Sequence, residues 1–127
     1  MTVTTNAMTT AMQGLAQALE APRRPGVSLG NWRWDVRQRM GAVRDALIAE
    51  GALGSEGLFA AREGGLLRER TLLLNRLSAL GPRVLESADV DAVRADLLRL
   101  LTDISHHLQR LHDLAYDEVE LELGGSE

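Results

Sequence analysis

The chain has 127 residues, a formal net charge of −4 and no cysteine, and only 3% of its residues are aromatic. This length accommodates one domain with a modest core, and a chain without cysteine has neither disulfides nor thiolate metal ligands. No apolar run reaches the roughly 18 residues of a membrane-spanning helix and no signal peptide is evident, so we expect a cytoplasmic protein without membrane association. Because leucine outnumbers β-branched and aromatic residues, helices are favoured over strands.

Residues 1–27 are predicted to form a flexible N-terminal arm. They begin with a threonine-rich stretch and end in the Pro22–Gly26 segment, which a helix does not cross. An alternative follows from four apolar residues at helical spacing, namely Met8, Met12, Leu15 and Leu19. They indicate a short amphipathic helix that forms on contact with the domain or with a partner.

The first helix is predicted for residues 31–50. Asn31 is its expected N-cap, since the side chain can accept a hydrogen bond from a free amide of the first turn. The expected inward residues are Leu29, Trp32, Val36, Met40, Val43 and Leu47. Trp34 points elsewhere and is flanked by arginines. Its ring is either covered by the arginine stems or free to anchor a protein partner or to stack on a nucleotide base.

The second helix is predicted for residues 56–80. Ser55 is its expected cap, and the Gly81–Pro82 pair should end it because proline does not continue a helix. The Gly64–Gly65 pair indicates a kink, a break or a close approach of the backbone. The expected inward residues are Phe59, Leu66, Leu73, Leu77 and Leu80, with Leu67 and Leu74 beside them.

The third helix is predicted for residues 90–115, capped by Asp89 or Ser87, and it carries the strongest periodic signal in the chain. Its stripe comprises Val90, Val93, Leu97, Leu100, Ile104, Leu111 and Leu114, with His107 as the one polar position. At roughly 1.5 Å per residue the three helices would be about 30, 37 and 40 Å long. The last should therefore project beyond the others, and we expect a second subunit to cover its excess apolar stripe.

These elements predict an all-α fold, an antiparallel three-helix bundle with a long C-terminal helix over residues 28–123. The short N-terminal helix would be an addition to this bundle, and residues 124–127 are predicted to be a disordered tail. Residues 118–123 alternate acidic and apolar side chains. They either continue the last helix or form an extended strand that docks on the sheet edge of a partner.

All three histidines, His106, His107 and His112, lie on the last predicted helix. Histidines on a bundle helix resemble those of the hemerythrin-like and di-iron families, which implies a metal-binding bundle as an alternative function. Those families draw ligands from several helices, whereas the other helices here lack histidine, so we predict no metal and no cofactor. The polar face of this helix, which we expect to be solvated with local ion pairs, comprises Asp103, His106, Arg110, Asp113 and Asp117.

His107 is distinct because it occupies a core-stripe position. One interpretation is a buried histidine with one ring nitrogen satisfied by water or by a side chain. The other is a contact at a helix or subunit interface that sets the register or responds to pH.

Catalytic and nucleic-acid signals are weak: no glycine-framed nucleophile is present, and arginines alternate with acids. Residues 86–127 carry three arginines and eleven acids, a net charge of −8. This acidic end is either a solvated surface or a surface that faces a partner or the earlier helices. We therefore predict a non-enzymatic protein-interaction or regulatory bundle, a homodimer with a further, unidentified protein partner as an option. The expected interface residues are Trp34, His107, Leu111, Leu114, Val119 and Leu121.

Overall fold

The computed structural model describes residues 2–20, 26, 28–53 and 60–125, and the side-chain surroundings of residues 7–20, 26, 28–50 and 64–113. It contains four α-helices, α1 (Thr2–Glu20), α2 (Leu29–Leu53), α3 (Ala60–Glu86) and α4 (Val90–Gly125). No strand occurs within the described ranges, so the predicted all-α class is confirmed. Among these helices, none combines the length and the apolarity that crossing a bilayer requires.

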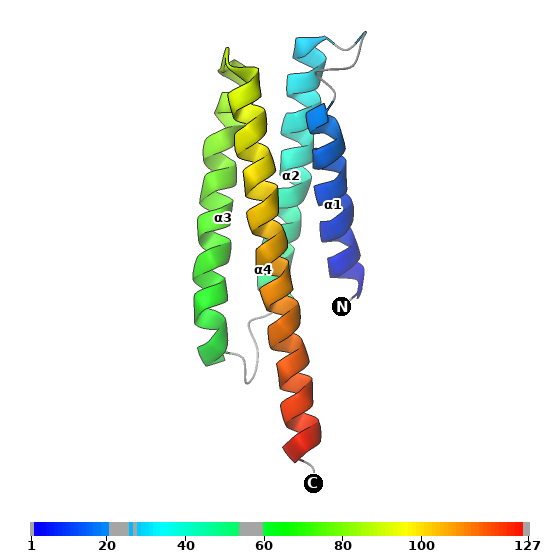
Figure 1. Cartoon of the computed structure of the whole chain (residues 1–127), viewed down its shortest axis with the longest axis vertical. Coiled ribbons are helices and arrows are strands. Elements are labelled where there is room, and N and C mark those ends of the chain that lie inside the picture. The colour runs from blue at the N-terminus through cyan, green and yellow to red at the C-terminus, as the bar shows by residue number, and fades with distance from the viewer. Residues whose placement is uncertain (1, 21–25, 27, 54–59, 126–127) are drawn as a thin grey trace.

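The four helices form one bundle in which consecutive helices lie side by side and run in opposite directions (Figure 1). α1 packs along α2 and also contacts α4, which closes the bundle. The expected three-helix bundle is therefore a four-helix bundle. The reason lies in α1, whose residues Met8, Leu15 and Leu19 are fully buried in the shared core. The spacing of these residues predicts a short helix added to the bundle, whereas α1 has 19 residues and contributes to the bundle core.

The end of α1 is held by hydrogen bonds from two other helices. The last carbonyl groups of a helix have no partner within the helix itself. Here the indole Nε1 of Trp32 donates to the carbonyl oxygen of Ala18 (2.9 Å), and Nε of Arg94 donates to that of Leu19 (2.7 Å). Trp32 belongs to α2 and Arg94 to α4, so both neighbours fix α1 in the bundle.

The core largely follows the predicted stripes. The predicted residues that are buried are five in α2, three in α3 and four apolar ones in α4, namely Trp32, Val36, Met40, Val43, Leu47, Leu73, Leu77, Leu80, Val93, Leu97, Leu100 and Ile104. Leu29 and Leu67 were expected to face inward but are about half exposed. Leu29 is the first residue of α2, and it is less buried than Trp32, Val36 and the other stripe residues further along the helix.

The N-cap of α2 is Ser28 rather than Asn31. The Oγ of Ser28 accepts a hydrogen bond from the amide of Asn31 (3.1 Å), and its carbonyl oxygen accepts one from the amide of Trp32 (3.0 Å). Serine is as good an N-cap as asparagine, so the helix begins where the first suitable side chain occurs.

The prediction that α3 ends before the Gly81–Pro82 pair is wrong, because the helix includes this pair and continues one further turn beyond it, to Glu86. This turn buries Val84, which is 1% exposed. Its terminal carbonyl groups are bound from α2, where the guanidinium of Arg33 donates to the carbonyl oxygens of Leu85 (3.0 Å) and Ser87 (2.6 Å). These contacts offset the hydrogen bond that proline removes from a helix.

The Gly64–Gly65 pair does not break α3, which is continuous from Ala60. A side chain at Gly65 would meet no atom within 4 Å, so close packing does not explain this residue. The predicted cap Ser55 and the predicted core residue Phe59 lie outside the described residues.

α4 begins at the predicted cap and extends further than expected. The Oδ1 of Asp89 accepts a hydrogen bond from the amide of Ala92 (3.0 Å), which confirms the capping prediction. The helix runs to Gly125, so residues 118–123 are helical and not extended. Of the predicted tail, residues 124 and 125 belong to this helix, and residues 126 and 127 lie outside the described residues. The C-terminal part of α4 projects past the ends of the other helices (Figure 1).

Candidate functional site: a buried histidine between two carboxylates

His107 is the one polar residue among the buried side chains that the structure describes, and its side chain is 0% exposed. Its Nε2 lies 2.7 Å from Oε2 of Glu50, and its Nδ1 lies 2.6 Å from Oε1 of Glu69. Because Glu50 belongs to α2 and Glu69 to α3, the imidazole joins three helices. Both ring nitrogens face carboxylate oxygens, which accept but do not donate, so the geometry matches an imidazolium that donates twice.

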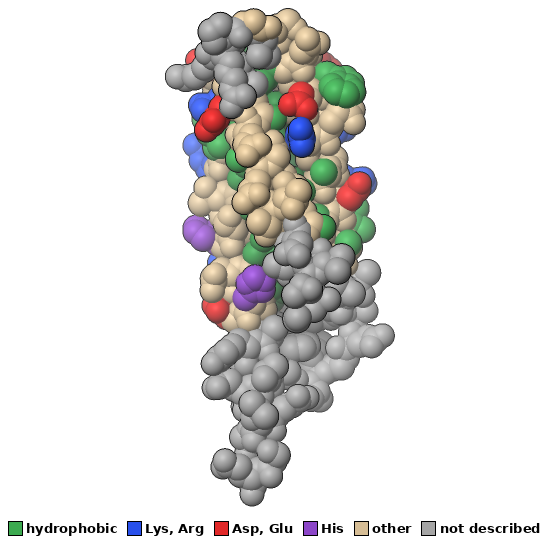
Figure 2. Space-filling model, turned by 90° about the vertical axis from the view of Figure 1, so that its right-hand side faces the viewer, with side chains coloured by type: hydrophobic (Ala, Val, Ile, Leu, Met, Phe, Trp, Pro, Cys, Tyr) green, Lys and Arg blue, Asp and Glu red, His purple; other side chains and the backbone are tan. Residues whose placement is uncertain are grey.

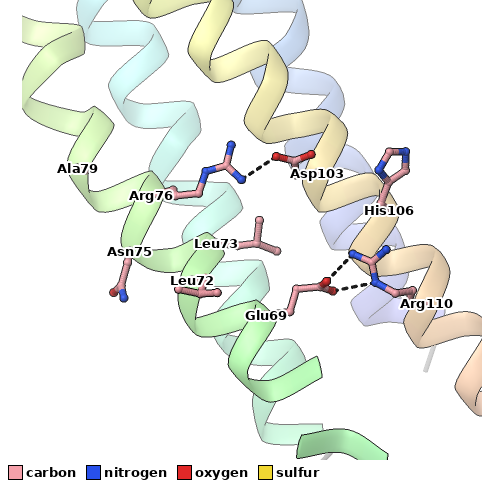
Figure 3. A pocket seen from close by; sticks show the side chains of 9 residues that line it. All are labelled: Glu69, Leu72, Leu73, Asn75, Arg76, Ala79, Asp103, His106 and Arg110. Carbon is pink, nitrogen blue, oxygen red and sulfur yellow. Dashed lines mark hydrogen bonds and ion pairs between the residues drawn. The ribbon is translucent and has the colours of Figure 1, made fainter. Parts of the chain in front are cut away.

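Two arginines complete the network. Arg110 of α4 binds Glu69 with two nitrogens, Nε to Oε1 (3.2 Å) and Nη2 to Oε2 (Figure 3). Nη1 of Arg70 lies 3.6 Å from Oε2 of Glu50. The other oxygen of Glu50, Oε1, is buried and has no hydrogen-bond partner among the residues that the structure describes. Glu69 is therefore held from two sides, whereas Glu50 depends chiefly on His107.

The surroundings shift two ionisation equilibria. Burial lowers the pKa of His107, but hydrogen bonds to Glu50 and Glu69 and the charges of these carboxylates outweigh burial, so the pKa is raised above 6.5. Burial raises the pKa of Glu69, but hydrogen bonds from Arg110 and His107 and their charges lower it below 4.5. The Glu69 carboxylate and the His107 imidazolium are therefore both charged between about pH 4.5 and pH 6.5.

A buried ion pair of this kind specifies geometry more than it adds stability. Removing the charges from water costs several kcal/mol per ion, and the attraction between them offsets this cost only when the geometry is good. Removing a single partner is costly, at about 3–5 kcal/mol, because it leaves an uncompensated buried charge. In this bundle the network fixes which residues of α2 and α3 lie opposite His107.

Sequence reasoning missed Glu50 and Glu69 as partners of His107, although a signal was present. Glu50 follows Leu47 by three residues and Glu69 precedes Leu73 by four, so each occupies a core-stripe position of its own helix. A polar residue on the core stripe of three helices indicates an internal network. His107 is buried, as the first interpretation expects, but both of its ring nitrogens are paired rather than one. Its contacts join helices, as the second interpretation expects, and a role in register or in a response to pH stays a prediction.

The three histidines do not converge. His107 faces the interior, whereas His106 and His112 are exposed and line different grooves, one between α3 and α4 and one between α1 and α4. Figure 3 shows His106 on α4, turned away from the Glu69–Arg110 pair. Among the described residues, no three histidine, aspartate or glutamate side chains are placed to hold a metal ion.

The polar face of α4 pairs with α3 rather than only with itself. Arg76 of α3 binds Asp103 (2.7 Å), and Arg110 binds Glu69, so the expected local pairs are largely contacts between helices (Figure 3). Local pairs also form within α4, between Gln109 and Asp113 (3.1 Å) and between Arg99 and Asp96 (3.3 Å).

The predicted interface residues are spread along the molecule. Trp34 is 65% exposed and lies in the second turn of α2, at the end of the bundle opposite the C-terminus of α4 (Figure 1). Leu111 is partly buried. Leu114, Val119 and Leu121 lie on the helical backbone of α4, but their side-chain surroundings are outside the described part of the chain.

The groove between α1 and α4 is lined by apolar and uncharged polar side chains, and no acid or arginine is among its described lining residues. It is lined by Thr9, Met12, Gln13, Ala16, Leu98, Leu101, Thr102, Ser105, Leu108, Gln109 and His112. Within α1 the only charged residue is Glu20 at its end. On the side of the molecule shown in Figure 2, uncharged side chains and backbone accordingly make up most of the middle of the described surface.

Comparison of the chain with protein-family models, with curated proteins and with solved structures finds no significant match.

Proposed function

We propose that this chain is a non-enzymatic protein-interaction bundle that forms a homodimer through the projecting part of α4. The observation that carries the proposal is the length of α4, which has 36 residues against 19, 25 and 27 for α1, α2 and α3. A helical segment of one or two turns without tertiary contacts is only marginally stable in water, because helical stability in proteins comes mainly from packing of an apolar face.

The composition of the projecting part supports an association with another helix. Residues 111–123 contain the apolar residues Leu111, Leu114, Ala115, Tyr116, Val119, Leu121 and Leu123. They also contain five acids and no arginine, and acids near a helix C-terminus oppose the macrodipole. A helix of this composition gains stability when a partner covers its apolar side.

An antiparallel contact between two copies of α4 fits the charge distribution. Residues 90–110 carry three arginines and three aspartates and are neutral, whereas residues 111–125 carry five negative charges. An antiparallel pair places each acidic end beside the neutral part of the other α4, so the two acidic ends do not repel each other. Isologous contacts of this kind produce closed dimers.

The groove between α1 and α4 is the surface that we assign to the incoming helix. It extends along α4 from Leu98 to His112, and the part of α4 that follows extends from residue 113 to residue 125. At roughly 1.5 Å per residue both segments are about 20 Å long. A two-fold axis near His112 would therefore place the C-terminal segment of each α4 in the groove between α1 and α4 of the other copy. The groove presents no acid that would repel the acidic helix.

The test is the molar mass of the full chain by light scattering over a range of concentrations. We expect about twice the monomer mass of 13.9 kDa for the wild type, and the monomer mass for Leu114→Glu/Leu121→Glu. Ser105→Arg, an exposed substitution within the groove, should also give a monomer, whereas the exposed Ser78→Arg on α3 should remain dimeric. A monomeric wild type, or a dimer that survives all of these substitutions, contradicts the proposal.

Trp34 distinguishes this dimer from an assembly through the other end of the bundle. Trp34→Ala should leave the dimer intact because the residue lies far from the C-terminal part of α4. A loss of the dimer in this variant would move the interface to α2.

A further inference from the structure

The network around His107 lies at the end of the bundle where α2 finishes and α3 begins. Glu50 is three residues before the last residue of α2, and Glu69 is in the third turn of α3. Both carboxylates meet on the same imidazole of α4, at 2.7 and 2.6 Å. His107 therefore ties the ends of two helices to a third, just before α4 leaves the bundle.

We propose that His107 is a proton-operated latch, which holds the end of α2 against α4 while the imidazole is protonated and releases it when the proton is lost. A neutral imidazole has one N–H donor, so its second nitrogen would present a lone pair to a carboxylate oxygen at hydrogen-bond distance. One of the two contacts then changes from a charged hydrogen bond to a repulsion inside the core, where an unpaired charge is costly.

The charged groups around the imidazole determine which contact breaks. The groups that face it are Glu50 from α2, Glu69 and Arg70 from α3, and Arg110 from α4 itself. In its described residues, α1 contributes no charged side chain to this end, since Glu20 lies at its opposite terminus.

Glu69 keeps its partner when His107 loses the proton, because Arg110 binds both of its oxygens. Glu50 keeps only the longer ion pair from Arg70 to its Oε2, at 3.6 Å, and its buried Oε1 has no hydrogen-bond partner in the described part of the chain. Glu50 must then reach water to be solvated. Deprotonation therefore releases the end of α2, and α3 stays attached through Glu69 and Arg110.

The direction of the pH effect follows from proton linkage. The pKa of His107 is raised in the closed state, so the latch contributes fully below about 6.5 and is lost as pH rises through the raised value. Between about pH 6.5 and the raised pKa of His107, opening of the α2 end releases one proton. The opening constant of the α2 end should therefore rise about tenfold per pH unit and level off at higher pH.

Hydrogen exchange of the full chain tests the proposal without reference to dimerisation. For the amides of residues 46–50, the exchange rates are first corrected for the intrinsic rise of exchange with pH. The opening constant obtained from them should then increase with pH between pH 6.5 and pH 9. Glu50→Gln should abolish this increase, because a neutral amide can pair with either form of the imidazole. His106→Gln, a substitution at the exposed neighbouring histidine, should leave it unchanged. A pH-independent opening constant in the wild type, or the same increase in Glu50→Gln, overturns the proposal.

A second measurement applies even if Glu50→Gln does not fold. Titration of the wild-type imidazole by NMR should give a midpoint above 6.5 for His107, with chemical-shift changes in the amides at the end of α2 that follow the same midpoint. A midpoint at or below 6.5, or α2 amides that do not respond, overturns the latch. Because exchange and titration report on one chain, a monomeric wild type would contradict the proposed function and leave the latch intact.

Discussion

The guanidinium of Arg33 lies 2.6 Å from the carbonyl oxygen of Ser87, a residue 54 positions later in the chain. This contact joins the second turn of α2 to the end of α3, beyond a proline that would otherwise be expected to terminate the helix. Together with the bond from Arg33 to the carbonyl oxygen of Leu85 (3.0 Å), it makes α2 the external cap of α3.

Replacing this cap should cost stability. Arg33→Met keeps most of the apolar stem but removes both hydrogen bonds, and we expect it to lower the free energy of unfolding by about 1–2 kcal/mol. Arg39→Met is the matched control, because Arg39 is exposed and its one ion pair in the described part of the chain is with Asp35 of the same helix, a contact that contributes about 0.5 kcal/mol or less. Urea denaturation of both variants checks this, and equal losses would contradict the capping role.

We expect the buried residues of α1 to contribute to the stability of the whole bundle. Leu15 is 0% exposed, so Leu15→Ala should lower the free energy of unfolding by about 2–4 kcal/mol through lost burial and the cavity that remains. Gln17→Ala, an exposed substitution in the same helix, should change it by less than about 0.5 kcal/mol. A small effect of Leu15→Ala in thermal or urea unfolding would favour a three-helix core with α1 loosely attached.

Removing the imidazole should be more costly than its size suggests. His107→Leu leaves Glu50 without its main partner inside the core, and we expect a loss of about 3 kcal/mol at pH 7. Addition of Glu50→Gln should restore part of this loss, because the buried charge is then removed as well. A double-mutant cycle measured by urea denaturation gives the coupling, and additive effects would show that the two side chains do not interact.

The network should define the pH range of greatest stability. The lowered pKa of Glu69 means that its contribution is present above about 4.5 and is lost as pH falls through the lowered value. The raised pKa of His107 means that its contribution is present below about 6.5 and is lost as pH rises through the raised value. Both are fully present between these limits. Tm measured from pH 3 to pH 10 should therefore decline on both sides, and His107→Leu/Glu69→Gln should flatten both declines.

The sequence was sufficient for features that depend on near neighbours. The stripe from Trp32 to Leu47 and the one from Val93 to Ile104 follow a helical period that is visible within each segment, and both are buried. The Asp89 cap is equally local, since its side chain binds an amide three residues later. These interactions need no knowledge of what the helix packs against.

The features that were missed depend on residues far apart in the chain. The last turn of α3 exists because Arg33, from another helix, binds its carbonyl groups. The partners of His107 are 57 and 38 residues away. Each glutamate lies on the core stripe of its own helix, but that pattern does not reveal which residue of another helix it meets. Propensity and periodicity describe one helix at a time, so they do not reveal such pairs.

The connection between α3 and α4 also bears on the order of folding. It comprises only residues 87–89, and Ser87 binds the amide of Asp89 through its Oγ (3.1 Å), so the turn is ordered by its own side chains. Short-range closure is fast and loses little chain entropy, so α3 and α4 should pair in the folding transition state before α2 supplies Arg33. Kinetic φ-values near one for Val84→Ala in α3 and near zero for Val36→Ala, a buried residue of α2, would establish that sequence, and the reverse pattern would exclude it.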